Sequence, residues 1–394
     1  MEDSEFLEQN DIQEEITLDE SSILAEDVSM DDALEDNDID NLEGFEPELD
    51  VPLDEQLPNN SVNAFYDHNE SIYTITNHPI DRNLIVTGGG DDKAFLWDSE
   101  TGATMAEYSG FEDSVSECKF NFDGEYLAIG SLNGIVKVYS GTELVCDLDC
   151  GGDLSWIDWH PRGNLLMAGE ENGSIWVWNV PKGDCLFVLS GHTSKLSCGM
   201  FSCDGKAIVS GSDTEFIVWD PKTGKPVLKY DTQDSRYHQD SITCVDVHKD
   251  NCLAVTGSTD FTAKLVHLQS HKIIASYENA GDSIEAVCFS TQVPYLATAS
   301  MDGRLSIWDI ASSKMRGSVK SDGAGFTKVK FHEQSPLVST SSIDNIVRIY
   351  DYRTMQCELA LKGHTDAVID FCLNEKDRKI ITASDDGSSL VFPY

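Results

Sequence analysis

The sequence repeats itself with a period near 42 residues, and this repeat restricts the fold more than any other feature does. Each unit contains a β-rich run that ends in an apolar anchor, which is aromatic in seven units and is followed by a polar residue in all units but the last. The eight anchors are Trp97, Tyr139, Trp178, Trp219, Val266, Trp308, Tyr350 and Phe392, at intervals of 42, 39, 41, 47, 42, 42 and 42 residues. Eight such periods fit four short strands per unit plus turns. We therefore predict an all-β, eight-bladed β-propeller over residues 61–394.

Polar residues recur inside each unit at fixed distances from the anchor. An Asp or Asn about six positions before the anchor marks a tight turn, because these residues accept turn backbone angles and bond their own main chain. The turn residues are Asp91, Asn133, Asn172, Asp213, Asp260, Asp302, Asp344 and Asp386. Four units also open with a histidine, and these are His68, His192, His238 and His364. The turn of the fourth unit is one residue short, so Asp213 fits the pattern less well.

These features resemble the WD-repeat family, in which a His, a strand Ser or Thr, the turn Asp and the Trp form a buried hydrogen-bonded network. The resemblance implies two structural sets, one in the last unit and one in the fourth. They are His364 with Ser384 and Asp386, and His192 with Asp213 and Trp219. The second, third, sixth and seventh units lack the His, and we expect their networks to be incomplete.

The two ends of the repeat region are expected to meet. The chain stops at Tyr394, just after the third strand of the eighth unit, and the segment 61–66 is in phase to supply the missing outer strand. Such pairing removes an exposed sheet edge and closes the ring. The one long interval, 47 residues, places an inserted loop near residues 231–240.

Residues 1–60 have a different composition. They contain 23 Asp or Glu residues and neither Lys nor Arg, and the first basic residue is Arg82. Because a segment this charged cannot bury enough apolar surface to offset its ordering entropy, we predict a disordered acidic tail. It is either a solubilising extension or an arm that engages a basic client.

Charge also restricts the partners. The formal net charge is -43, which repels nucleic acids and anionic lipid and attracts Lys- and Arg-rich polypeptides. We expect a basic protein partner, no direct nucleic-acid or membrane binding, and a monomer. No signal peptide opens the sequence, and the 11 cysteines show no metal-ligand spacing. These features predict a protein of the cytoplasm, the nucleus or both, without disulfides or bound metal.

The motifs of common enzyme classes are absent from the sequence. Neither GxxxxGK[ST] nor HExxH nor GxSxG occurs, and Gly88–Lys93 precedes a β-rich run rather than a helix. We therefore expect a non-enzymatic protein without a cofactor.

The WD-repeat resemblance implies which residues meet a partner. In that family, two sets of loops share one face around the ring axis. Carried over, the predicted partner-binding residues are Glu70, Tyr73, Glu112, Asp113, Asp153, Glu170, Glu171, Asp240, Asp282, Glu285, Met301, Asp366 and Asp385. This face would be acidic with apolar spots, which suits a peptide that offers Arg and Lys. The alternative is a merely solvated rim, because the repeats carry 47 acidic against 27 basic residues.

Several longer stretches resemble the family of the angio-associated migratory cell protein and its fungal relatives. They are 87–98, 156–169, 178–185 and 257–266. The fungal members are chaperones that hold the basic N-terminal segment of a large-subunit ribosomal protein and aid 60S assembly, and the resemblance implies that role here. A scaffold or adaptor in signalling or in ubiquitin ligation remains the alternative.

Overall fold

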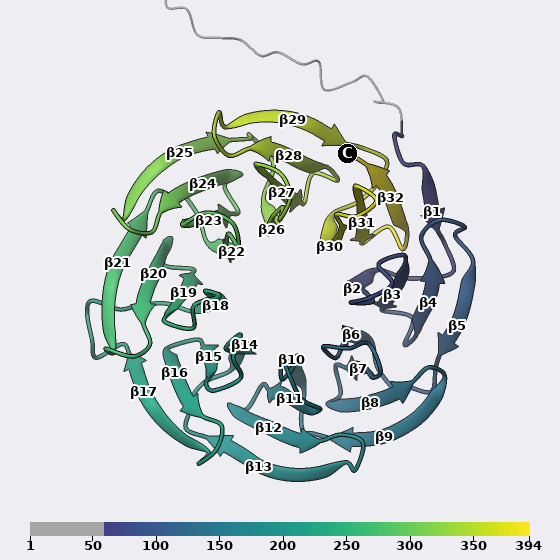
Figure 1. Cartoon of the computed structure of the whole chain (residues 1–394), viewed down its shortest axis with the longest axis horizontal. Helices are drawn as coiled ribbons and strands as arrows, with labels where there is room; N and C mark the ends of the chain where they lie inside the picture. The colour runs from purple at the N-terminus through teal and green to yellow at the C-terminus, as the bar shows by residue number, and fades with distance from the viewer. Residues whose placement is uncertain (1–58) are drawn as a thin grey trace, which may run out of the picture. The chain divides into compact units, whose positions relative to one another are not determined.

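A computed structural model describes residues 59–394, which form eight four-stranded antiparallel sheets around a common axis (Figure 1). The eight-bladed propeller predicted from the repeat is confirmed. What the sequence predicts for residues 1–58 lies outside the described residues.

Seven blades are meanders of four consecutive strands, and blade 8 takes its outer strand from the N-terminal β1. The strands of each blade are named here from the ring axis outward. Blade 1 has β2 (Ile72–Asn77), β3 (Leu84–Gly89), β4 (Ala94–Asp98) and β5 (Thr104–Tyr108), and blade 2 has β6 (Val115–Phe120), β7 (Leu127–Ser131), β8 (Ile135–Ser140) and β9 (Glu143–Asp149). Blade 3 has β10 (Leu154–Trp159), β11 (Leu165–Glu170), β12 (Ser174–Asn179) and β13 (Asp184–Ser190), and blade 4 has β14 (Leu196–Phe201), β15 (Ile208–Ser212), β16 (Glu215–Asp220) and β17 (Lys225–Asp231). Blade 5 has β18 (Ile242–Val247), β19 (Leu253–Ser258), β20 (Thr262–His267) and β21 (Lys272–Glu278), and blade 6 has β22 (Ile284–Phe289), β23 (Tyr295–Ser300), β24 (Arg304–Asp309) and β25 (Lys314–Lys320). Blade 7 has β26 (Phe326–Phe331), β27 (Leu337–Ser342), β28 (Val347–Asp351) and β29 (Gln356–Leu361), and blade 8 has β30 (Val368–Asn374), β31 (Lys379–Ser384), β32 (Ser389–Pro393) and the N-terminal β1 (Asn63–Phe65).

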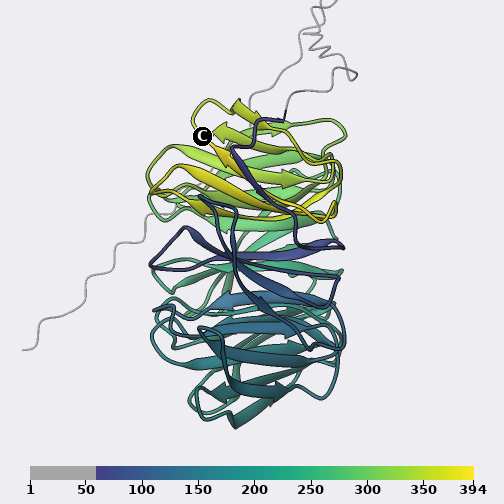
Figure 2. The same ribbon diagram turned by 90° about the vertical axis from the view of Figure 1, so that its right-hand side faces the viewer.

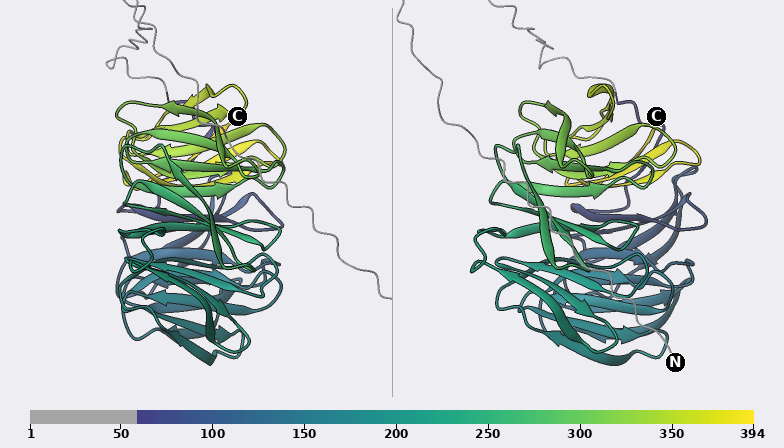
Figure 3. Two further views of the ribbon diagram at one scale, coloured as in Figure 1. Left: turned by 90° about the vertical axis from the view of Figure 1, so that its left-hand side faces the viewer. Right: turned by 60° about the vertical axis from the view of Figure 1, so that its left-hand side comes forward.

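Burial along the strands explains the residue types in each unit. The second strand of a blade is covered on both faces by its neighbouring blades, and β7 and β15 are buried at every position. Small and β-branched residues therefore fill these strands. The outer strands alternate between exposed and less exposed positions, as in β21, where only Tyr277 is fully buried. The loops gather on two opposite faces of the ring, as the side views show (Figures 2 and 3).

The ring closes through β1. Asn63, Ala64 and Phe65 pair antiparallel with Val391, Leu390 and Ser389 of β32. This pairing lies inside the segment 61–66 that the sequence assigns to the last blade. Phe65 is buried and stacks on Trp97 of blade 1 with ring centroids 4.9 Å apart. The N-terminal strand therefore joins blade 8 to blade 1 by hydrogen bonds and by packing.

The histidine network of blade 8 differs from the prediction in one residue. His364 Nδ1 lies 2.9 Å from Asp386, as expected, but its Nε2 lies 2.6 Å from Thr382 Oγ1 rather than near Ser384. Ser384 Oγ instead donates to the carbonyl of Asp366. Burial acts to raise the pKa of Asp386, but the bonds to His364 and Ser388 outweigh it and hold that pKa well below its usual range.

The network of blade 4 also corrects an expectation. His192 Nε2 lies 2.6 Å from Ser210 Oγ, which accepts a hydrogen bond of 2.8 Å from Trp219 Nε1. The predicted Asp213 does not reach the histidine. Glu215 takes its place, with a carboxylate oxygen 3.5 Å from His192 Nδ1. The turn is one residue short, so the acid is supplied by the first residue of β16.

Candidate functional site

One face of the ring is built by two sets of loops that are bonded to each other in every blade. The first residue of each turn between the second and third strands donates its backbone N–H to the carbonyl of the residue just before an inner strand. Eight such bonds occur, from Gly90 to Ser71, Leu132 to Ser114, Glu171 to Asp153, Asp213 to Lys195, Thr259 to Ser241, Met301 to Ser283, Ile343 to Gly325 and Asp385 to Ala367. We call this the candidate face. Because these hydrogen bonds hold the two sets of loops together, the backbone that carries the side chains of this face is fixed.

The candidate face is strongly acidic. Its sixteen loop segments (66–71, 90–93, 109–114, 132–134, 150–153, 171–173, 191–195, 213–214, 232–241, 259–261, 279–283, 301–303, 321–325, 343–346, 362–367 and 385–388) contain 19 Asp or Glu residues and four Lys or Arg residues. The loop segments of the opposite face contain nine of each kind. The negative charge of the described loops is therefore concentrated on one side of the ring.

Four of the predicted aspartates occupy equivalent positions around this face. Asp113, Asp240, Asp282 and Asp366 each accept a hydrogen bond from the backbone N–H of the next residue, at 2.7–2.8 Å. All four are exposed. One oxygen of each carboxylate fixes the side chain, and the other is free to meet a cation. Carboxylates held in a fixed orientation in this way suit charge-assisted hydrogen bonds from Lys or Arg.

Other predicted acids and Tyr73 complete the ring of exposed groups. Glu70 and Tyr73 both border Gly90, where an added Cβ would lie 3.0 Å from Glu70 Oε2 and 3.3 Å from the Tyr73 hydroxyl. Glu112, Asp153 and Asp385 are exposed in the loops of blades 2, 3 and 8. The structure thus brings these residues to one face.

Glu171 and Glu285 are partly engaged by neighbours. The Glu171 carboxylate pairs with the Lys195 ammonium of blade 4. Glu285, on the inner strand β22, accepts a hydrogen bond of 2.5 Å from the Ser283 hydroxyl. Both side chains remain half-exposed, so a basic segment could still reach them.

Glu170 occupies a different environment from the other predicted residues. It is 4% exposed, and its oxygens accept hydrogen bonds from the Asn172 amide and, at 3.1 Å, from Trp176 Nε1. Blade 3 has no histidine network, and Glu170 supplies the buried acceptor there. Its position indicates that it orders the turn of the blade, so direct contact with a partner stays a prediction.

Apolar groups interrupt the acids on the candidate face. Met301 and Ile343 meet over Gly325, where an added Cβ would lie 3.0 Å from Ile343 and 3.1 Å from Met301. Leu132 and Phe261 are also exposed, at 40% and 46%. Phe261 was missed in the sequence, although it stands where four other turns have Gly, and its φ is 66°. Bulky residues rarely adopt this backbone conformation. A Phe at a turn position where Gly is usual is therefore a sequence signal that could have identified Phe261 as a candidate binding residue.

Metal-binding clusters and membrane-spanning helices are both absent from the described residues. Within residues 59–394, no group of three or more His, Cys, Asp or Glu side chains is placed to hold a metal ion. In the same range, no helix is long and apolar enough to cross a membrane. The arrangement of the candidate face can bind cations and small apolar anchors.

Comparison with known proteins fixes the family. The profile of the WD domain, G-beta repeat, matches residues 59–98, 102–140, 144–179, 183–220, 231–267, 271–309 and 355–392. The chain belongs to the WD40-repeat family. The matches leave out residues 310–354, which include β26, β27 and β28 of blade 7. In that blade Arg348 bonds Asp344 at 2.9 Å and Ser342 at 3.0 Å, in a WD40 blade without the histidine.

Relatives within the family match over most of their length. The human angio-associated migratory cell protein is 32% identical over 372 residues, which is 89% of this chain and 85% of the relative. The ribosome assembly protein SQT1 of Saccharomyces cerevisiae is 24% identical over 86% of this chain and 88% of its own. The crystal structure of Chaetomium thermophilum Sqt1 bound to the N-terminus of the ribosomal protein L10 superposes with a TM-score of 0.81 at 24% identity, over 86% of this chain and 100% of that one.

Proposed function

We propose that this chain is a non-enzymatic chaperone that holds the basic N-terminal segment of a large-subunit ribosomal protein on its candidate face and so aids assembly of the large subunit. The proposal rests on one observation. The loops of the candidate face hold 19 acidic and four basic residues, whereas the loops of the opposite face hold nine of each kind. The relatives support it, since one of them is a ribosome assembly protein. The solved neighbour holds the N-terminus of a ribosomal protein.

The physical mechanism follows from the fixed carboxylates. A newly made ribosomal protein is cationic and sticks to RNA, and a ring of preset acids competes for the same Lys and Arg side chains. The patch of Met301 and Ile343 gives an apolar residue of the client a place to pack. Release occurs when ribosomal RNA offers more phosphate contacts than the face offers carboxylates. We also propose that the chain acts in the cytoplasm, the nucleus or both, as a monomer without a cofactor.

Charge reversal on the two faces tests the proposal. The double variant Asp282→Lys, Glu285→Lys changes the candidate face, and Asp123→Lys, Glu125→Lys makes the same change in net charge on the opposite face. We expect the first variant to bind a fluorescent peptide of the ribosomal protein's N-terminus at least about 100-fold more weakly, because two charge-assisted bonds worth about 1.5–3 kcal/mol each are lost. The second variant should stay within about twofold.

Two controls make the outcome decisive. Thermal melting of both variants checks that the fold is intact, and a peptide of the same composition in scrambled order measures binding by charge alone. If both variants lose affinity equally, or if the scrambled peptide binds as tightly as the natural one, the proposed site is wrong. Affinity purification at low salt should then recover signalling or ubiquitin-ligation partners instead of one dominant ribosomal protein.

A further inference from the structure

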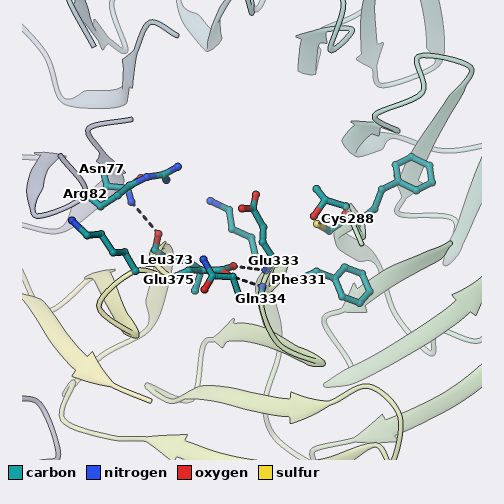
Figure 4. Close-up of a pocket in the computed structure, with 12 residues that line it drawn as sticks. Asn77, Arg82, Cys288, Phe331, Glu333, Gln334, Leu373 and Glu375 are labelled. Atoms are coloured by element: carbon teal, nitrogen blue, oxygen red, sulfur yellow. Dashed lines mark hydrogen bonds between the residues drawn. The ribbon is translucent and has the colours of Figure 1, made fainter. Parts of the chain in front are cut away.

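A cavity of about 390 Å³ opens on the face opposite the candidate face, between blades 6, 7, 8 and 1. Its walls come from the ends of four inner strands and from the loops that follow them (Figure 4). Cavities of this volume are typical of sites for small molecules. Nothing in the proposed chaperone role uses it.

The cavity concentrates positive charge on an otherwise balanced face. Arg82, Lys330 and Lys376 all line it. No carboxylate oxygen of residues 59–394 lies within 4.0 Å of any of these three cationic groups. Figure 4 shows the Arg82 side chain reaching into the open centre of the cavity. Lysines elsewhere near the ring axis are paired, as Lys328 is with Asp370 and Lys119 with Asp158.

The two acids of the cavity do not neutralise these cations. Both oxygens of Glu375 are used by the next loop, accepting the backbone N–H groups of Glu333 at 2.5 Å and Gln334 at 2.9 Å. Glu333 is exposed at the rim. Three cations therefore face one carboxylate that is free of hydrogen bonds within the described chain.

Lys330 shows that this positive charge is unfavourable without a ligand. The neighbouring Lys328 ammonium, together with burial, lowers the pKa of Lys330 to about 8. Asp370 and the thiols of Cys372 and Cys288 act in the opposite direction but do not cancel the effect. An anion placed beside Lys330 would relieve the repulsion and restore its charge.

The walls suit a compact anionic ligand. Phe289 and Phe331 border the cavity, but their rings are buried in the blades, where they pack on His248 and Tyr352. Leu373 of β30 is the third apolar residue of the lining. Asn77 Nδ2 donates to the Leu373 carbonyl at 3.0 Å and fixes the wall between blades 8 and 1. Arg and Lys arranged around such a pocket recognise carboxylate or phosphate groups.

We propose that this cavity is a binding site for a small polyanion that carries two or more phosphate or carboxylate groups. The site is separate from the candidate face and goes beyond the proposed chaperone function. Arg82 and Lys376 would hold the outer anionic groups, and Lys330 the innermost one. Because the ligand sits on the opposite face, a basic client and the polyanion can bind the same molecule together.

Calorimetric titration of the full chain tests the proposal with two probes, inositol 1,4,5-trisphosphate and citrate, at constant ionic strength. We expect at least one probe to bind with a Kd below about 100 μM. Arg82→Gln and Lys330→Met should each weaken that binding about 10-fold or more. Lys182→Gln removes one charge from the same face outside the cavity and should change it less than twofold.

The two probes identify the anionic chemistry, since a preference for one of them distinguishes phosphate from carboxylate ligands. Binding at pH 8 should also take up protons, seen as a dependence of the heat on the buffer, and Lys330→Met should abolish this uptake. Absence of binding up to about 1 mM would overturn the proposal, as would equal weakening by Lys182→Gln. If Lys330→Met melts early, the exposed Arg82→Gln decides the outcome. Unchanged client-peptide binding in the Arg82→Gln variant separates this site from the chaperone function.

Discussion

His192 illustrates how single residues stabilise the propeller and how they make its stability depend on pH. Its side chain is fully buried and lies 2.6 Å from Ser210 Oγ and 3.1 Å from Ser212 Oγ. Burial lowers the pKa of His192 to about 4, from the ordinary value near 6.5. Between these two values the unfolded chain binds a proton that the folded chain does not. The contribution of this group to stability is therefore present above about pH 6.5 and is lost as the pH falls toward 4.

The first prediction concerns this pH dependence. Lowering the pH from 7.5 to 5.5 should cost the wild type about 1.5 kcal/mol through His192 alone, and His192→Asn should reduce the pH-dependent loss by that amount. Urea unfolding at both pH values measures it, above the isoelectric point of about 4.3. The control is His271→Asn at an exposed position with φ of 54°, which Asn tolerates. An unchanged pH dependence in the His192 variant would contradict the assignment.

At the residue scale, the sequence predicts residue types better than partners. The repeat located His192, Trp219, His364 and Asp386 correctly, because spacing from the anchor fixes their strand position. It did not reveal that Glu215 replaces Asp213. A turn shortened by one residue shifts which side chain faces the histidine, and that depends on backbone geometry rather than on spacing.

The candidate site was predictable to a similar degree. The sequence assigns Asp113, Asp240, Asp282 and Asp366 to loops of one face, and they lie there in the structure, while their contact with a partner stays a prediction. The sequence does not reveal which acids are buried, because Glu170 resembles its neighbour Glu171 in the repeat but its side chain is buried in the blade. The pairing of Lys195 with Glu171 joins two adjacent blades, and such contacts depend on the tertiary structure.

At the scale of elements, β1 is the one strand among residues 59–394 that joins its blade from a distant part of the sequence, and the ring depends on it. Its Phe65 is 2% exposed and packs on Trp97 and Phe95, whereas the adjacent Tyr66 is 66% exposed. The three-residue strand thus contributes its stabilisation mainly through one side chain and three backbone pairs. Blade 8 would otherwise leave β32 as an unpaired edge.

The second prediction follows from this closure. Phe65→Ala should lower the free energy of unfolding by about 3–5 kcal/mol, because a fully buried aromatic side chain is removed. Tyr66→Ala is the matched control and should change it by less than about 0.5 kcal/mol. Deletion of residues 61–67 should destabilise the whole propeller, while deletion of residues 1–55 should leave its melting temperature within a few degrees. Equal melting of the Phe65 and Tyr66 variants would show that β1 is dispensable.

At the scale of the whole molecule, the two faces of the ring differ in charge although the blades repeat. Each turn needs an Asp or Asn for its own geometry, and this requirement alone places acids on the candidate face. Further acids stand at loop positions with no such requirement, among them Glu70, Glu112 and Asp153. The balanced opposite face shows that acidic composition does not spread evenly over the surface. The excess on one side is therefore a property that the repeat itself does not explain.

This asymmetry leads to the last prediction, which concerns the rate at which a basic client arrives. A one-sided field accelerates association and is screened by salt, while dissociation depends on short contacts. Stopped-flow measurements with the client peptide should show the association rate constant falling about 10-fold or more between about 25 and 300 mM NaCl, with a smaller change in the dissociation rate constant.

Matched variants separate the face from the rest of the molecule. The pair Asp282→Lys, Asp366→Lys should flatten the salt dependence, and Asp123→Lys, Glu125→Lys should not, although both change the net charge equally. A chain lacking residues 1–55 measures the contribution of the acidic tail, since residues 1–60 hold 23 of the 70 acids. If both double variants flatten the salt dependence alike, attraction comes from the net charge of -43. The candidate face would then lose its role in steering, because its carboxylates would act no differently from those of any other surface.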